Sequence, residues 1–237
     1  MWQEELPVTL QIAAICNDGW VLASDRRQVD HYPLRTSSSV KKLMLVDGRL
    51  AYSVWGNRLA VLAGNELVDA ISAGRLRIDN ENTLRQGLTA LGDLVWRRAR
   101  TDMENDLTPI DPDPNSQGIV VFFPNRADCF WILGVGRRSF AEVHTDKLPI
   151  GDRANPATFF LDRYHSLTMS IDELIFLAAH VICLGETFNS SGVSGLDMIV
   201  RRGDTISEQN RGELITLKQR SLELDLKLSD CFHPLTH

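Results

Sequence analysis

Three residues near the start of the chain could together activate a hydroxyl nucleophile: Thr9 near the start of one predicted strand, Asp25 at the end of the next, and Lys41 at the start of a third. A threonine hydroxyl is a weak nucleophile, but the α-amine of the same residue can act as its base, because that amine has a pKa of about 7.7–8.0. A lysine nearby lowers the proton affinity of both groups, and an aspartate keeps the lysine charged and oriented. Spacing alone also fits a plain strand threonine, a turn-capping aspartate and a surface lysine.

The segments that would position these residues form two successive hairpins. Their turns contain Asn17-Asp18-Gly19 and Asp47-Gly48, which favour tight reversals. The predicted strands are Val8–Ile15, Trp20–Ser24, Lys42–Val46 and Leu50–Val54, and the stretch from Arg26 to Ser39 is predicted to be irregular. Because the ends of two adjacent hairpins can converge, the three reactive side chains can meet.

The hydrophobic period then changes to the three-to-four spacing of amphipathic helices. The remaining predicted elements are the helices Asn57–Ala73 and Asn82–Arg100, the strands Gly118–Phe123, Cys129–Val135 and Phe140–His144, the helices Pro156–Arg163 and Ile171–Leu184 (the latter with Ser170 as N-cap), the strand Leu196–Arg201 and the helix Glu213–Leu222. Thr101–Gln117 is acidic and proline-containing, which predicts an exposed loop. Strands and helices in segregated runs indicate an α+β layered fold in one domain.

Composition narrows the class of protein. The chain has 237 residues, 43% hydrophobic and 24% charged, as in ordinary globular proteins, and its net charge of -6 argues against a nucleic-acid-binding surface. The basic run Arg97–Arg100 reads as the solvated end of a helix. Without a signal pattern or a stretch of about 18 apolar residues, we expect a cytoplasmic protein with no membrane partner.

Metal and disulfide chemistry have little support in the sequence. Its four cysteines contain no CxxC pair, and its six histidines show neither HxH nor HxxxH spacing. Buried free thiols and surface or core histidines are therefore the preferred interpretations, and no cofactor or metal is predicted.

A family resemblance adds to this reading. Thr9–Arg27 (TLQIAAICNDGWVLASDRR) resembles the opening of proteasome β subunits, and Ser39-Val40-Lys41-Lys42 is similar to their V-K-K segment. The intervals from Thr9 to Asp25 (25 − 9 = 16) and from Asp25 to Lys41 (41 − 25 = 16) match the family's nucleophile, aspartate and lysine. The resemblance implies an N-terminal-nucleophile (Ntn) hydrolase with a four-layer αββα sandwich, in which two antiparallel sheets lie between helix layers.

Two further segments are similar to the family more loosely. Ser53-Val54-Trp55-Gly56 resembles the segment whose backbone N–H forms the oxyanion hole, with Trp55 in the usual glycine slot, so the resemblance assigns Gly56 to that site. Ser191-Gly192 resembles the family's S-G-G stretch, which implies that Ser191 supports the amine of the nucleophile.

The accessory positions depart from the family. Phe188 stands three residues before Ser191, where the family has an aspartate, and Gly151-Asp152-Arg153 replaces the family's G-S-G with its supporting serine. The resemblance therefore predicts a complete core triad within an altered shell, which weakens activity more than it changes roles.

The mechanism requires Thr9 to be the N-terminal residue. Residues 1–8 are therefore interpreted as an N-terminal extension or propeptide, and residues 9–237 as a single Ntn hydrolase domain. Val8, unlike the glycine common in family precursors, crowds the hydroxyl that would cleave the chain. Initiation at a GTG codon for Val8 would instead expose Thr9 after methionine trimming, a hypothesis that any other codon at that position would remove.

The expected function is threonine-type peptidase or amide hydrolase activity on peptide or protein substrates. The expected assembly is a homo-oligomeric ring or stack, with Asn57–Ala73 and Asn82–Arg100 as contact helices; a regulatory ATPase partner stays open. Two alternatives remain: a catalytically silent assembly subunit that keeps the fold, and a small-molecule amidase of the same superfamily.

Overall fold

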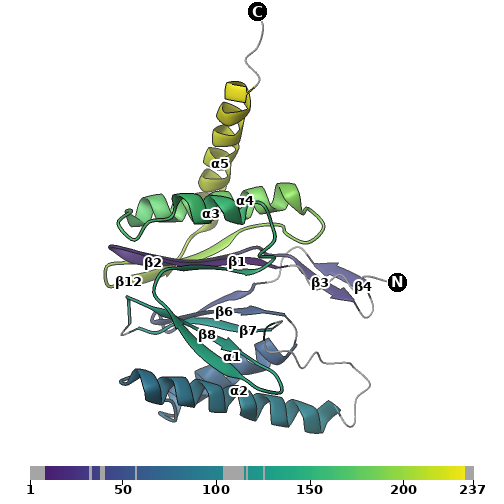
Figure 1. Cartoon of the computed structure of the whole chain (residues 1–237), viewed down its shortest axis with the longest axis vertical. Coiled ribbons are helices and arrows are strands. Elements are labelled where there is room, and N and C mark those ends of the chain that lie inside the picture. The colour runs from purple at the N-terminus through teal and green to yellow at the C-terminus, as the bar shows by residue number, and fades with distance from the viewer. Residues whose placement is uncertain are drawn as a thin grey trace, which may run out of the picture.

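The protein is a four-layer sandwich, in which two five-stranded antiparallel sheets lie face to face and helices cover each outer face (Figure 1). The computed structural model describes residues 9–31, 34–37, 41–56, 58–103, 115, 117–124 and 126–232. The predicted α+β class and αββα layering are confirmed.

The first sheet holds the start of the chain at its centre. Its strand order is β10-β1-β2-β11-β12, with β1 (Leu10–Cys16), β2 (Gly19–Ser24), β10 (Lys147–Gly151), β11 (Asp197–Arg202) and β12 (Thr205–Glu208). The second sheet has the order β5-β6-β7-β8-β9, with β5 (Leu43–Val46), β6 (Leu50–Trp55), β7 (Gly118–Phe122), β8 (Phe130–Gly134) and β9 (Phe140–His144). A separate hairpin joins β3 (Gln28–His31) to β4 (Leu34–Ser37). Both predicted hairpins, β1–β2 and β5–β6, are present.

Each sheet has its own helices. The helices α1 (Arg58–Ser72) and α2 (Glu81–Met103) pack on the second sheet, while α4 (Ile171–Phe188) packs on β1 and β2 of the first with α3 (Thr158–Tyr164) beside it. The last helix, α5 (Arg211–Phe232), contacts α4 at its base and projects away from the layers (Figure 1). Within the described ranges, no helix is both long and apolar enough to cross a membrane.

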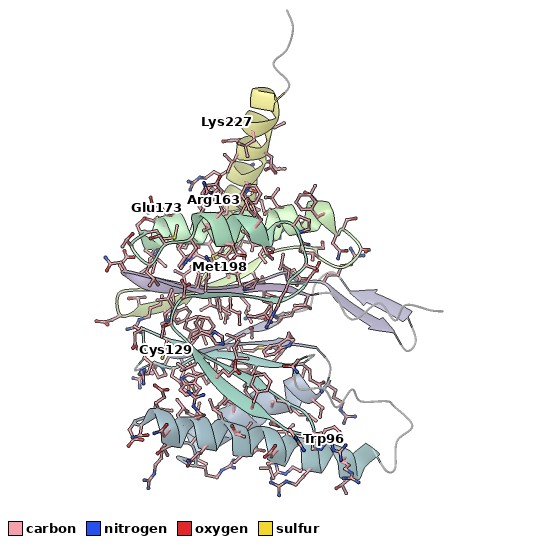
Figure 2. All side chains as sticks on the ribbon, in the orientation of Figure 1. Trp96, Cys129, Arg163, Glu173, Met198 and Lys227 are labelled. Carbon is pink, nitrogen blue, oxygen red and sulfur yellow. The ribbon has the colours of Figure 1, made fainter. Side chains whose placement is uncertain are left out.

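Side-chain alternation along the central strands divides the core. On β1, Leu10, Ile12 and Ala14 face the α3–α4 layer, whereas Ala13 and Ile15 face the second sheet. Side chains fill the space between all layers (Figure 2). Between the sheets, the rings of Trp20 and Phe122 stack with centroids 4.0 Å apart. The strands β1 and β2 are thus buried on both faces, and the residues that follow or precede them enter the site from packed strands.

The predicted helices and strands are present with boundaries shifted by a few residues, and Ser170 caps α4 through the expected side-chain hydrogen bond to the N–H of Glu173. Three predictions are corrected. Arg26–Ser39 contains β3 and β4 and is not wholly irregular, α2 runs into the predicted loop as far as Met103, and α5 continues to Phe232. The rest of the predicted loop Thr101–Gln117 lies largely outside the described residues, and residues 1–8 lie outside them entirely.

Besides β3 and β4, the strands β10 and β12 are not predicted from the sequence. The strand β10 contains Pro149, which cannot donate to a ladder, but β10 is an edge strand where proline is tolerated. The strand β12 lies at the opposite edge and is mostly exposed, so its sequence lacks an apolar alternation.

Candidate active site

Thr9 lies immediately before β1, with its side chain buried between the sheets. Its carbonyl oxygen accepts a hydrogen bond of 2.7 Å from the N–H of Asp152, just beyond the end of β10. Gly151 makes this approach possible: its φ of 84° lies in the left-handed region, and a Cβ there would be 1.8 Å from the Thr9 carbonyl oxygen. The backbone of β10 therefore fixes where Thr9 sits.

Asp25 follows β2 and is fully buried, with 0% of its surface exposed. Its Oδ1 accepts a hydrogen bond of 3.0 Å from the N–H of Leu10, and its Oδ2 accepts one of 2.9 Å from the N–H of Arg27. The N–H of Asp25 in turn donates to the carbonyl oxygen of Leu10 at 3.0 Å. These bonds attach Asp25 directly to the residue after Thr9.

Lys42 joins the other two residues. Its Nζ donates to Thr9 Oγ1 at 2.9 Å and lies 2.8 Å from Asp25 Oδ1, while only 6% of its surface is exposed. A hydroxyl, an ammonium and a carboxylate are thus connected in a buried row. The site expected from the sequence is assembled, but with a different lysine.

Lys41 does not reach Thr9, which corrects the expected placement by one residue. Its Nζ lies 2.7 and 2.9 Å from the carboxylate oxygens of Glu208 on the exposed edge strand β12. Both lysines precede β5, outside the paired part of the strand, so strand alternation does not decide which of them points inward. The adjacent pair Lys41-Lys42 marks this segment in the sequence. The equal 16-residue intervals pointed to Lys41, whereas Lys42 is the lysine that contacts Thr9.

Burial governs the electrostatics of the pair. Burial lowers the pKa of the Lys42 ammonium, and the Asp25 carboxylate offsets part of that effect. Burial also raises the pKa of Asp25, against the opposing influence of Lys42 and of the N–H groups of Arg27 and Leu10. An ammonium with a lowered pKa is a stronger hydrogen-bond acid toward an oxygen that gains negative charge, which is the change that Thr9 Oγ1 undergoes when it loses a proton.

A buried polar link that sequence reasoning missed joins the two sheets beside this row. Ser53 Oγ donates to Gln11 Oε1 at 2.8 Å, and Gln11 Nε2 donates to the carbonyl oxygen of Val54. The N–H of Val54 donates to the carbonyl oxygen of Lys42 at 3.2 Å. Gln11 and Ser53 are fully buried, so these bonds fix the end of β6 against Thr9 and Lys42.

Gly56 lies at the same end of β6, exposed and with a φ of 88°. Its position directly after the linked residues is compatible with a backbone donor near Thr9. Among the described residues no hydrogen bond joins Gly56 to Thr9, so its assignment to the oxyanion hole stays a prediction.

Ser191 is connected to Thr9 indirectly. Its Oγ donates to Asn189 Oδ1 at 3.0 Å, and Asn189 Nδ2 donates to Asp152 Oδ2 at 3.2 Å. Asp152 is the residue whose N–H holds the Thr9 carbonyl oxygen. Asn189 is the member of this chain that sequence reasoning did not single out, while Phe188, at the position of the family's aspartate, is exposed.

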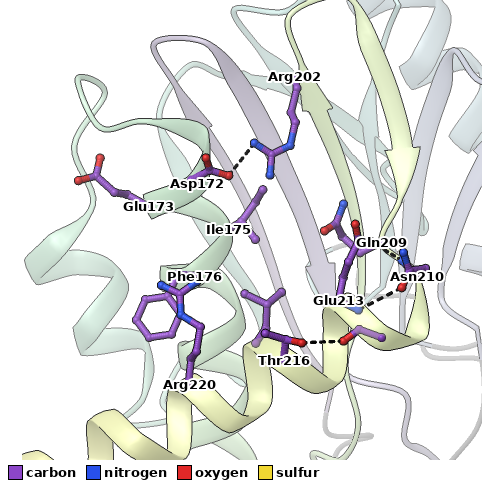
Figure 3. Close-up of a pocket in the computed structure, with 12 residues that line it drawn as sticks. Asp172, Glu173, Ile175, Phe176, Arg202, Gln209, Asn210, Glu213, Thr216 and Arg220 are labelled. Carbon is purple, nitrogen blue, oxygen red and sulfur yellow. Dashed lines mark hydrogen bonds and ion pairs between the residues drawn. The ribbon is translucent and has the colours of Figure 1, made fainter.

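The hollow in Figure 3 lies elsewhere, between the start of α4, the end of β11 and the base of α5. Its volume is about 780 Å³, and Arg202 and Asp172 form an ion pair of 2.7 Å at its rim. Arg220 stacks over Phe176 there at 4.6 Å. None of Thr9, Asp25 and Lys42 lines it. In the part of the chain that the structure describes, no group of three or more histidine, cysteine, aspartate or glutamate residues is placed to hold a metal ion.

Comparison with known proteins identifies solved structures that share this fold. No protein-family model matches the sequence, and no curated protein matches it significantly. Among solved structures, the Gly-1 mutant of Anbu from Hyphomicrobium sp. strain MC1 has a TM-score of 0.67 at 16% identity, covering 97% of this chain and 98% of that one. Anbu from the same strain has a TM-score of 0.65 at 16% identity, covering 96% and 98%.

Anbu from Yersinia bercovieri, described as an ancestral β-subunit, has a TM-score of 0.62 at 15% identity, covering 95% of this chain and 97% of that one. Because all three likenesses extend over nearly the whole of both chains, the protein has the proteasome-like fold of the Anbu structures. At these identities the likeness concerns the fold, and chemistry has to be argued from the site.

Proposed function

We propose that this chain, which has the Anbu fold, is a threonine-type amide hydrolase that cleaves peptides or proteins once Thr9 has become its N-terminal residue. The observation that carries the proposal is the position of Lys42 Nζ, within 2.9 Å of Thr9 Oγ1 and 2.8 Å of Asp25 Oδ1 in a buried setting. Burying an ion pair costs desolvation free energy. Because this pair contacts a hydroxyl, we interpret it as a group that activates that hydroxyl for attack.

The proposed reaction is an acyl transfer. Thr9 Oγ1 attacks the substrate carbonyl while its proton passes to the Thr9 α-amine, and the Lys42 ammonium stabilises the oxygen as charge develops. The backbone N–H after β6, at Gly56, receives the oxyanion. The amine then gives its proton to the leaving nitrogen as the carbon–nitrogen bond breaks, and water hydrolyses the ester to restore Thr9.

We expect a protein that begins at Thr9, released from a cleavable N-terminal fusion, to form a covalent adduct with a β-lactone or epoxyketone. The protein that begins at Met1 and is not trimmed should form none. The reason is that an amide nitrogen cannot accept the hydroxyl proton, whereas a free amine can near neutral pH. Intact-protein mass spectrometry measures the adduct, and Thr9→Ala in the shorter protein is the control.

Equal labelling of both proteins would show that Thr9 does not act through its own amine. If neither protein reacts and Thr9→Ala changes nothing, the chain is a catalytically silent subunit. The exposed Phe188, where a family carboxylate is absent, is the observation that favours this second reading. Turnover of small amides without turnover of peptides would favour the amidase alternative.

We also propose that the protein assembles with copies of itself, because α5 presents apolar side chains that its own body does not cover. On α5, Leu222 and Leu226 are 63% and 65% exposed, although their neighbours Ser221 and Asp225 lie against His180 of α4. They lie four residues apart and therefore on one side of the helix. The helices α1 and α2, expected to form contacts, expose one large apolar residue among their described side chains, Val61.

Light scattering at tens of micromolar should therefore show a multi-subunit particle. The variant Leu222→Glu/Leu226→Glu should shift it toward monomer, because two carboxylates would be buried without partners in an interface. Val61→Glu, at a similarly exposed apolar position on α1, is the matched control. If only Val61→Glu dissociates the particle, the interface is formed by α1 and α2, as the sequence predicted, and not by α5. A monomeric parent protein would contradict assembly altogether.

A further inference from the structure

The backbone around Thr9 determines which neighbour its nitrogen faces. In an extended chain the N–H and C=O of one residue point to the same side, and successive residues alternate. Leu10 follows this rule, since its N–H reaches Asp25 Oδ1 and its carbonyl oxygen accepts from the N–H of Asp25. The Thr9 carbonyl oxygen points the opposite way, to the N–H of Asp152. The nitrogen of Thr9 therefore lies on the side of Asp152, away from Asp25.

Asp152 carries a carboxylate that is fixed in place at this position. Its Oδ2 accepts two hydrogen bonds, from Asn155 Nδ2 at 3.1 Å and from Asn189 Nδ2 at 3.2 Å. Both amides are anchored in turn: Asn155 Oδ1 accepts from the N–H of Ala157, and Asn189 Oδ1 accepts from Ser191 Oγ and the N–H of Gly192. Two side-chain amides with fixed orientations hold one carboxylate oxygen.

The second oxygen of that carboxylate is available. Among the residues that the structure describes, Asp152 Oδ1 has no hydrogen-bond partner, and the side chain is half-buried. A carboxylate with one oxygen fixed and one open, on the residue toward which the Thr9 nitrogen points, is suited to accept a hydrogen bond from the amine that this nitrogen becomes.

We infer that Asp152 is the positioning residue for the α-amine of Thr9, holding it through Oδ1 while Asn155, Asn189 and Ser191 orient the carboxylate. The inference rests on the proposed use of that amine as the base. It gives Asp152 the place left by the family's supporting serine, and it supplies, from the residue after β10, the negative charge that Phe188 does not provide. Ser191 then acts on the amine through Asn189 and Asp152.

The arrangement has a consequence for the acidity of the amine. A carboxylate next to an ammonium favours the charged form, so Asp152 raises the pKa of the Thr9 amine, whereas the Lys42 charge lowers it. Charged side chains near the ends of the elements that meet at Thr9 include Asp25, Arg26, Arg27, Lys42, Asp152, Arg153 and Glu186. Replacing Asp152 by an isosteric neutral residue removes one of these charges and leaves the others in place.

The test compares the parent protein beginning at Thr9 with its Asp152→Asn variant. The pH dependence of α-amine acetylation by acetic anhydride, followed by mass spectrometry of the N-terminal peptide, reports the pKa of the amine directly. We expect Asp152→Asn to lower its midpoint by about one pH unit. The acid limb of β-lactone labelling should move in the same direction, because the amine becomes free at lower pH.

The fold of the variant should survive, since the amide oxygen of an asparagine can still accept from Asn155 and Asn189. The matched control is Asp204→Asn, an exposed aspartate in the β11–β12 turn at the other end of the same sheet, which should move neither midpoint. Unchanged midpoints in Asp152→Asn would overturn the inference. A shifted amine midpoint without β-lactone labelling of the parent would uphold the positioning of the amine and defeat the hydrolase proposal.

Discussion

Lys42→Met should abolish covalent labelling and hydrolysis, with a loss of about a thousandfold or more, while Lys41→Met should leave both unchanged. The first substitution removes the ammonium that contacts Thr9 Oγ1 at 2.9 Å. The second removes an exposed ion pair with Glu208, a contact that water screens. Rates of β-lactone labelling in the protein beginning at Thr9 compare the two neighbouring lysines directly.

Loss of activity through unfolding has to be separated from loss of chemistry. Lys42→Met leaves the Asp25 carboxylate buried without its cation, which costs about 3–5 kcal/mol at neutral pH. Burial raises the pKa of Asp25 in the folded protein above its value in the unfolded chain. The destabilisation therefore grows as pH rises from the unfolded pKa through the folded pKa, and it shrinks as pH falls back. Urea unfolding of Lys42→Met should therefore approach that of the parent at acid pH, and a folded but unreactive variant supports the role of Lys42. Labelling lost in Lys41→Met and kept in Lys42→Met would reverse the assignment.

Much of the candidate site was predictable because its signals are local. Thr9 and Asp25 lie at the ends of strands joined by an Asx-Gly turn, and the register of β1 with β2 brings those ends together. The choice between Lys41 and Lys42 was not predictable in this way. Both residues precede the first ladder pair of β5, so their directions depend on how the chain enters the sheet. Sequence spacing predicts that a lysine near this position contacts Thr9, whereas tertiary packing determines which of the two lysines does so.

The surrounding shell depends on contacts between distant parts of the sequence. The Gln11–Ser53 bond joins strands from different sheets, and Asn189 meets Asp152 from the end of α4. No periodicity marks such pairs, because each residue is an ordinary polar side chain in its own segment. The fold was predictable to a similar extent. The apolar periodicity of the sequence predicts the helices and the central strands, whereas the edge strands β10 and β12 form through pairing with neighbouring strands that the sequence pattern does not reveal.

Gly151→Ala should destabilise the protein by about 3 kcal/mol or more, and should lower the labelling of Thr9 in whatever fraction remains folded. Two physical effects add at this position. A φ of 84° is unfavourable for any residue with a Cβ, and that Cβ would lie 1.8 Å from the Thr9 carbonyl oxygen and 2.8 Å from its carbon. The chain can relieve the overlap by moving Thr9 and Gly151 apart, which lengthens the bond from the Asp152 N–H and displaces Thr9 Oγ1 from Lys42.

Gly203→Ala separates these two effects, because it shares the strained backbone without the collision. Gly203 has a φ of 54° in the β11–β12 turn, and a Cβ there would meet nothing within 4 Å. Its substitution should cost about 1 kcal/mol, the penalty of the left-handed conformation alone. Urea midpoints at constant m-value give both numbers. If Gly151→Ala is no more destabilised than Gly203→Ala and labels as fast as the parent, then β10 does not position the nucleophile. A larger loss with slower labelling ties the stability of this strand pairing to the chemistry of Thr9.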